Sequence, residues 1–266
     1  MMQQAPDGTA YEVIGDSGPQ VVLIHGLGMN RASWQWQAGS LGKHYQMITY
    51  DLYGHGDSPA PPSQPSLTLF SSQLSALLDH LGVGKAAVLG FSLGGMIARR
   101  FAMDHAARLW ALGILHSAHA RDKAAQDAIQ ARVHQAAAEG PAVTVEAALQ
   151  RWFTEGFRNR NPSTMDLVRK WILANRKGVY APIYQVLVDG VTELVAPQPP
   201  ITVPTLVMTG DQDYGNSPAM NRAIAAEIPG SLLVILPGLR HMAHAEAPEL
   251  FNSELMNFLS SVAAHD

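Results

Sequence analysis

The chain contains no cysteine among its 266 residues. This absence excludes a disulfide framework, a thiolate metal site and a cysteine nucleophile. It is also typical of proteins from a reducing compartment. The first twenty residues are polar and interrupted by glycine and proline, without the apolar region of a secretory signal. We therefore expect a cytoplasmic protein.

Charged residues are scarce, at 15% of the chain, and the formal net charge is −4. No basic run is longer than the pair Arg99-Arg100, which argues against a nucleic-acid surface or an anionic-membrane surface. No uncharged apolar stretch is long enough to span a bilayer. We expect partners that are neither nucleic acids nor membranes, and the sequence gives no indication of an oligomeric state. By contrast, 47% of the residues are hydrophobic, enough for a substantial core.

Short apolar runs alternate with helical patterns in the N-terminal half. The runs that predict buried strands are Val21–His25, Met47–Tyr50, Ala86–Phe91 and Trp110–Leu115. Leucines at helical spacing end at Leu81, where Gly82 follows as a C-cap, and Met96–Met103 predicts a second helix. This alternation predicts an α/β fold in which helices cover both faces of a mostly parallel central sheet.

The character of the sequence changes between residues 117 and 200. Alanine-rich, helix-forming segments replace the strand-like runs there. Two further strand-like runs, Thr205–Met208 and Leu232–Leu236, follow a proline-rich stretch. We therefore predict a core made of residues 1–116 and 201–266. Residues 117–200 are expected to form an inserted helical cap over the carboxyl ends of the strands.

The motif with the clearest chemical meaning is Gly90-Phe91-Ser92-Leu93-Gly94-Gly95, between a predicted strand and a predicted helix. A serine at such a turn adopts a strained backbone that projects its hydroxyl from the sheet edge, and the small residues around it leave room for the turn. The N–H groups that follow lie at a helix N-terminus, where they can stabilise an oxyanion. The string alone also fits an ordinary glycine-rich turn, but its placement favours Ser92 as a nucleophile.

A serine nucleophile needs a base and an orienting acid, which for this turn follow in the order acid, then histidine. Asp213 lies just past one predicted strand and His241 just past the next. Both loops are at carboxyl ends of strands, where α/β sheets collect their active groups. We predict His241 as the base and Asp213 as the acid.

Other residues near these loops are alternatives. Asp211 and Asp122 are alternative acids, but Asp211 is closer to the strand end and better placed to brace the loop. His244 is an alternative base, although on the first turn of the next predicted helix it is better explained as a packing histidine. After the earlier strands, we expect Asp51 and His55 to brace a glycine-rich loop that lacks the lysine of a phosphate-binding loop.

Two H-x-x-H spacings raise the possibility of a metal site. They are His116/His119 and His241/His244. No carboxylate or thiolate ligands are arranged around either pair in the sequence. We therefore predict neither a metal ion nor an organic cofactor.

Taken together, the segments HGLG, DLYGHGDS, GFSLGG, GDQD and RHMAHAEAPELF resemble the α/β-hydrolase superfamily from about residue 11 to the C-terminus. Within it the chain is similar to small serine esterases and 3-oxoadipate enol-lactonase-like hydrolases, a group that also includes cofactor-free haloperoxidases and perhydrolases. The resemblance implies the α/β-hydrolase fold and a triad of Ser92, Asp213 and His241. It also implies an oxyanion hole formed by the backbone N–H groups of Leu27 and Leu93.

The residue after the candidate base departs from one branch of this superfamily. Carbon–carbon bond hydrolases commonly carry a tryptophan there, and this chain has Met242. Dehalogenases and epoxide hydrolases use an aspartate nucleophile, whereas position 92 is serine. We expect a serine hydrolase that cleaves a carboxylic ester or lactone through an acyl-enzyme. The alternatives are carbon–carbon bond hydrolysis, perhydrolase or haloperoxidase-like chemistry, or a ligand receptor with little turnover.

The expected partner is therefore a small-molecule ester or lactone. We predict that it contacts Gly26, Met29, Trp152 and Met242. Further aromatic residues of the cap are candidates to line the pocket, although packing against the core explains most of them better: Phe153, Phe157, Trp171, Tyr180 and Tyr184. Arg31 and Arg121 are candidates to bind an anionic group on the substrate. A solvent-exposed position on the surface would explain either arginine equally well.

Overall fold

The computed structural model describes residues 1–263, so the last three residues of the predicted core segment 201–266 lie outside it. Eight strands form one sheet in the order β1-β2-β4-β3-β5-β6-β7-β8. The strands are β1 (Gln3–Gln4), β2 (Ala10–Ile14), β3 (Gln20–Ile24), β4 (Gln46–Tyr50), β5 (Ala86–Phe91), β6 (Leu109–Leu115), β7 (Thr205–Gly210) and β8 (Leu232–Leu236). From β4 to β8 all neighbouring strands are parallel, which confirms the predicted mostly parallel sheet.

Helices connect these strands. They are α1 (Gln35–Leu41), α2 (Leu67–His80), α3 (Leu93–Asp104), α4 (Lys123–Glu139), α5 (Ala142–Trp152), α6 (Glu155–Arg160), α7 (Pro162–Leu173), α8 (Lys177–Asp189), α9 (Pro218–Glu227), α10 (Ala243–Glu246) and α11 (Pro248–Ala263). None of the helices in residues 1–263 is both long enough and apolar enough to cross a membrane.

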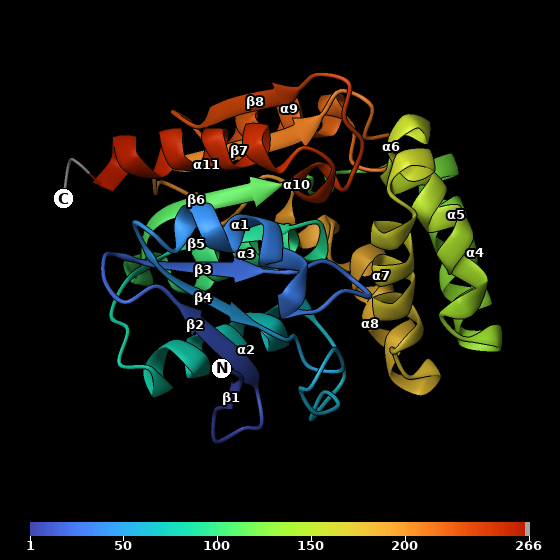
Figure 1. The fold of residues 1–266 in the computed structure, drawn as a ribbon, viewed down its shortest axis with the longest axis horizontal. Coiled ribbons are helices and arrows are strands. Elements are labelled where there is room, and N and C mark those ends of the chain that lie inside the picture. The colour runs from blue at the N-terminus through green and yellow to red at the C-terminus, as the bar shows by residue number, and fades with distance from the viewer. Residues whose placement is uncertain (264–266) are drawn as a thin grey trace.

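The central strand β5 separates two hydrophobic cores. All six of its residues are buried. Val88 packs into the core under α2, α3 and α9, whereas Ala87 and Leu89 pack into the core under α1 and α11. This alternation follows from the two-residue period of a strand. Helices therefore cover both faces, as predicted (Figure 1).

The sequence misses two strands at one edge of the sheet. β1 and β2 pair antiparallel, and β2 pairs antiparallel with β4. Both lie in the polar first part of the chain, and β2 is only partly buried. Its strand conformation depends on pairing with β4, more than thirty residues away, and local apolar patterning does not record such pairing.

The helices α4 to α8 all lie between β6 and β7, in the segment predicted to be the cap. In Figure 1 the arrows of β3, β4 and β6 point toward them. The carboxyl ends of the parallel strands therefore face the helical insertion, which agrees with the predicted fold class. That the insertion is a separate subdomain with the boundaries 117 and 200 stays a prediction.

Candidate active site

Ser92 occupies a tight turn between β5 and α3. Its backbone has φ +56°, in the left-handed region that a non-glycine residue seldom adopts. A Cβ at Gly90 would lie 2.0 Å from the carbonyl oxygen of Gly94, and a Cβ at Gly94 would lie 2.3 Å from that of Ile24. The backbone N–H of Ser92 donates to the carbonyl of Leu115 at 2.8 Å, which ties the turn to β6. The two glycines are therefore required for this turn to form against its neighbours.

The HGLG loop is held by two buried histidines. The Nε2 of His25 accepts from the N–H of Leu52 at 3.0 Å, and the Nε2 of His55 accepts from the N–H of Gly28 at 3.0 Å. Burial lowers the pKa of His25 to about 4 and that of His55 to about 3, so both rings are neutral acceptors near neutral pH. They tie the loops after β3 and β4 together, in keeping with the bracing role expected of His55.

Arg31 also connects these loops. Its backbone N–H donates to Oδ1 of Asp51 at 2.7 Å, and its guanidinium pairs with Asp51 and with Asp57. Oδ2 of Asp51 additionally accepts from the N–H of Asp57 at 2.8 Å. Arg31 therefore braces the loop after β4, and it does not line the cavity that contains Ser92. The suggested contact of Arg31 with an anionic substrate group is not supported.

Leu27 and Leu93 are the two residues whose backbone N–H groups are expected to form an oxyanion hole. Leu27 lies in the HGLG loop and lines the same cavity as Ser92. Leu93 is the first residue of α3, where N–H groups have no partner within the helix. The side chain of Leu93 is completely buried and does not line this cavity.

Asp213 and His241 form the central polar pair. The Nδ1 of His241 donates to Oδ2 of Asp213 at 2.7 Å. The other carboxylate oxygen accepts from the N–H groups of Gly215 at 3.1 Å and Asn216 at 2.9 Å. Burial would raise the pKa of Asp213, but the charge interaction with His241 and the hydrogen bonds hold it well below its ordinary range. Asp213 is therefore ionised, and Nε2 of His241 is free to act as an acceptor.

A second histidine, His116, binds the same carboxylate. Its Nδ1 lies 3.0 Å from Oδ2 of Asp213, the oxygen that accepts from His241. It follows β6 directly and has φ +49°, and its carbonyl accepts from the side-chain amide of Asn216. Burial lowers the pKa of His116, although the bond to Asp213 opposes this, so the ring is neutral. In the sequence, His116 stands out only as half of an H-x-x-H pair. Its position directly after a predicted strand is the one signal that could have placed it in the site.

The alternative acids lie elsewhere. Asp211 is exposed to solvent. Asp122 caps α4, where its Oδ1 accepts from the N–H of Ala125 at 2.8 Å. Neither lines the cavity that contains Ser92. Of the three aspartates considered, only Asp213 is brought to His241.

His244, the alternative base, is completely buried among aromatic rings. Its ring centroid lies 4.5 Å from that of Phe91 and 5.3 Å from that of Trp34. Neither ring nitrogen has a hydrogen-bond partner within residues 1–263. Burial lowers its pKa well below the ordinary value. His244 therefore packs against the back of the site and does not reach the cavity.

Neither H-x-x-H pair gathers as a pair of ligands. His119 instead contacts Glu227, with Nε2 2.9 Å from Oε1. One histidine from each pair does approach Asp213, and the possible ligand atoms of His116, Asp213 and His241 lie within 4.8 Å of one another. In this cluster, however, both Nδ1 atoms are at hydrogen-bonding distance from one carboxylate oxygen. A metal ion would have to replace both hydrogen bonds.

These groups open onto a cavity of about 310 Å³ between the core and the cap. Of the predicted site residues, those that line it are Gly26, Leu27, Met29, Ser92, Trp152, Asp213 and His241. Three arginines also line the cavity: Arg121, Arg132 and Arg151. Only Arg121 is among the residues predicted from the sequence. The structure thus brings residues from β3, β5, β7 and β8 loops to one space.

Some predicted pocket residues lie away from this cavity. The Met242 side chain is completely buried and does not line the cavity; its backbone N–H donates to the carbonyl of Trp152 at 2.9 Å. Among the cap aromatics, Tyr180 and Tyr184 line the cavity with Trp152. The remaining three, Phe153, Phe157 and Trp171, serve in packing.

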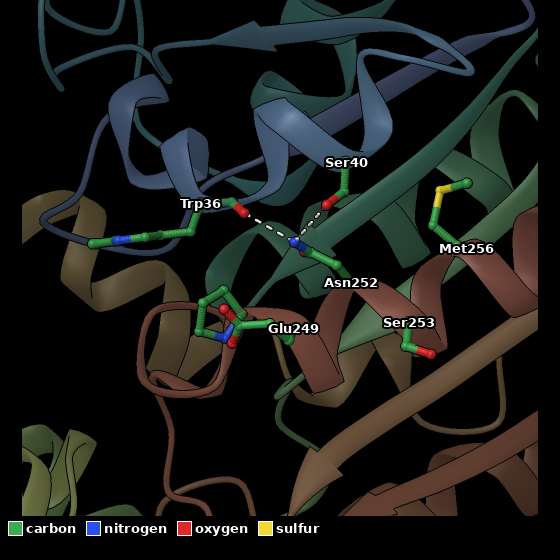
Figure 2. A pocket seen from close by; sticks show the side chains of 7 residues that line it. Trp36, Ser40, Glu249, Asn252, Ser253 and Met256 are labelled. Carbon is green, nitrogen blue, oxygen red and sulfur yellow. Dashed lines mark hydrogen bonds between the residues drawn. The ribbon is translucent and has the colours of Figure 1, made fainter.

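A second depression lies between α1 and α11. Figure 2 shows its polar centre, where the side-chain amide of Asn252 donates to the carbonyl of Trp36 at 2.9 Å and to the hydroxyl of Ser40 at 3.2 Å. Its one ionisable lining residue is Glu249. This depression has no histidine that could act as a base and no carboxylate hydrogen-bonded to one. The cavity at Ser92 is therefore the candidate active site.

Comparisons with known proteins agree with this fold. A family model described as the alpha/beta hydrolase family matches residues 21–254. The (E)-2-((N-methylformamido)methylene)succinate hydrolase of Acinetobacter baylyi is 26% identical over 98% of this chain and 97% of its own length. The 3-oxoadipate enol-lactonase 2 of the same species is 29% identical over 91% of this chain and 89% of its own.

The crystal structure of the enol-lactonase from Burkholderia xenovorans superimposes with a TM-score of 0.88 at 28% identity. It covers 96% of this chain and 98% of that one. These matches confirm the family resemblance inferred from the motifs. The chain therefore belongs to the alpha/beta hydrolase family.

Proposed function

We propose that this hydrolase cleaves a carboxylic ester or lactone through an acyl-enzyme formed on Ser92. The observation that carries the proposal is one cavity lined by Ser92 on its strained turn and by the hydrogen-bonded pair of Asp213 and His241. A serine hydroxyl is a weak nucleophile, so a base oriented by an ionised carboxylate is the arrangement that this chemistry requires.

In the proposed first step, Nε2 of His241 takes the proton of the Ser92 hydroxyl as Oγ bonds to the carbonyl carbon. The carbonyl oxygen becomes an oxyanion that accepts from the N–H groups of Leu27 and Leu93. Asp213 fixes the His241 tautomer and stabilises the imidazolium that forms.

The tetrahedral intermediate then collapses. The bond to the leaving alkoxide breaks, and His241 returns the proton to it; in a lactone this alkoxide stays attached to the acyl group. Water, deprotonated by His241, adds to the acyl carbon, and cleavage of the bond to Ser92 releases the acid and restores the hydroxyl.

The named relatives favour esters and lactones over the alternatives. Two are called enol-lactonases, and their lengths match this chain almost completely. Met242 after the candidate base departs from the tryptophan common in carbon–carbon bond hydrolases. No observation favours a receptor role, which turnover measurements would distinguish from catalysis.

The test uses purified protein with short-chain 4-nitrophenyl esters and simple lactones. Ser92→Ala should lower kcat by about 10⁴-fold or more while leaving Tm near that of the wild type. The matched control is Ser253→Ala, an exposed serine in the depression of Figure 2, which should keep full activity. Retained turnover in Ser92→Ala, or stoichiometric binding without turnover in the wild type, would overturn the proposal.

A further inference from the structure

The cavity at Ser92 carries three arginines from the inserted segment. Arg121 precedes α4, Arg132 lies on α4 and Arg151 lies on α5. All three are partly buried and line the cavity. Although they are distant in the chain, the packing of α4 against α5 brings Arg132 and Arg151 to the cavity that Arg121 and Ser92 also line.

None of these arginines has an acidic partner. In the part of the chain that the structure describes, no carboxylate forms an ion pair with any of the three. Arg121 donates to the carbonyl of Leu187 at 2.8 Å, and Arg132 donates to the hydroxyl of Tyr184 at 3.2 Å. The guanidinium group of Arg151 has no hydrogen-bond partner within residues 1–263. Most of the guanidinium donors therefore remain available.

The arginines repel one another. Burial, and next the charge of Arg132, lower the pKa of Arg121 to about 10, and the same two causes lower that of Arg151. Arg121 and Arg151 nevertheless stay protonated near neutral pH. The single carboxylate lining the cavity is that of Asp213, whose oxygens already accept from His116, His241 and two N–H groups. The cavity thus has an excess of positive charge, an unfavourable arrangement unless a ligand compensates it.

We propose that Arg121, Arg132 and Arg151 bind a free carboxylate of the substrate in the cavity that Ser92 also lines. The substrate is then an ester or lactone that carries a second, ionised carboxyl group. This inference rests on the proposed function, which it narrows to one substrate class. Guanidinium groups suit the task because their planar donors match the two oxygens of a carboxylate.

The first experiment compares two esters of equal acyl chain length, mono-(4-nitrophenyl) glutarate and 4-nitrophenyl pentanoate. The wild type should favour the glutarate in kcat/KM by about 10- to 100-fold, the range for charged hydrogen bonds in a partly buried site. Arg151→Gln and Arg132→Gln should each reduce the ratio of the two kcat/KM values, glutarate over pentanoate, by about tenfold. The matched control is Arg160→Gln, an exposed arginine of α6 outside the cavity.

The proposal requires that the preference for the glutarate ester depends on Arg132 and Arg151. A wild-type ratio at or below one would overturn the carboxylate site, and so would a preference that both cavity variants retain. Either result would leave the proposed function intact, because pentanoate would still be hydrolysed. Melting temperatures of all variants, compared with that of Arg160→Gln, show whether they are folded.

A binding measurement separates the two proposals completely. Glutarate should bind the wild type in isothermal titration calorimetry, and Arg151→Gln should weaken this binding about tenfold or more. If no ester or lactone is hydrolysed, the proposed function fails, but glutarate binding that is lost in Arg151→Gln would still support the carboxylate site. Absence of glutarate binding to the wild type, together with no preference among esters, would overturn it.

Discussion

The Nδ1 atom of His116 lies 3.0 Å from Oδ2 of Asp213. The same oxygen accepts from His241 at 2.7 Å, so two imidazoles share one buried carboxylate. Because a carboxylate oxygen has two lone pairs, both hydrogen bonds can form at once. His116 thereby limits the positions that Asp213 can adopt relative to His241, and it stabilises the ionised acid.

This arrangement makes His116 a positioning residue with a measurable effect. His116→Ala should lower kcat about tenfold with little change in KM, because one charge-assisted hydrogen bond to Asp213 is lost and two N–H donors with His241 remain. His116→Asn, which retains a donor and tolerates the positive φ at this position, should keep more of the activity. Wild-type kcat in His116→Ala would show that the second hydrogen bond is dispensable.

Replacing Asp213 should lower kcat more than replacing His116 does. Asp213→Asn is expected to lower kcat by about 10³- to 10⁴-fold, because the amide no longer fixes the tautomer of His241 or stabilises its charged form. The control is Asp211→Asn, which changes the exposed aspartate two residues earlier. Steady-state kinetics on 4-nitrophenyl acetate would check both variants. Equal losses in the two would contradict the assignment of Asp213.

The buried histidines of the loops predict that stability falls in acid. The pKa of His25 is about 4 and that of His55 about 3 in the folded protein, whereas an unfolded histidine titrates near 6.5. The unfolded chain therefore binds protons first as the pH falls. The stability that each neutral ring contributes is fully present above about pH 6.5 and declines by about 1.4 kcal/mol per pH unit down to its folded pKa.

Urea unfolding between about pH 7 and pH 4 tests this dependence. The free energy of unfolding should decrease with falling pH, and His55→Asn should reduce the slope by the share of one histidine. His44→Gln serves as the control because His44 is exposed. An unchanged slope in His55→Asn would show that this ring becomes protonated in the folded state.

Metal removal should leave hydrolysis unaffected. Although the atoms of His116, Asp213 and His241 are close enough to ligate an ion, the proposed mechanism uses both Nδ1 atoms as hydrogen-bond donors. Dialysis against a chelator should therefore preserve kcat, and added Zn²⁺ should inhibit if it displaces these hydrogen bonds. Loss of activity on dialysis, restored by a divalent ion, would replace this mechanism with a metal-dependent one.

The sequence determined most of the core fold. Strands such as β5 and β8 match their predicted bounds, because an apolar run between breakers records burial locally. The order of Ser92, Asp213 and His241 at the ends of separate strands was also visible, since parallel strands align their carboxyl ends at one edge of a sheet.

Tertiary structure determined which side chains surround Ser92, Asp213 and His241. Local patterns do not show which side chains meet across elements, so the bond of His116 to Asp213 was not foreseen. For the same reason Met242 was placed at the substrate, whereas packing buries it beside Trp152. The cationic side of the cavity likewise exists only because α4 and α5 pack together, since no basic run marks it in the chain. The sequence thus determined the order of the candidate catalytic residues, whereas the packing of the inserted helices decided which other side chains line the cavity.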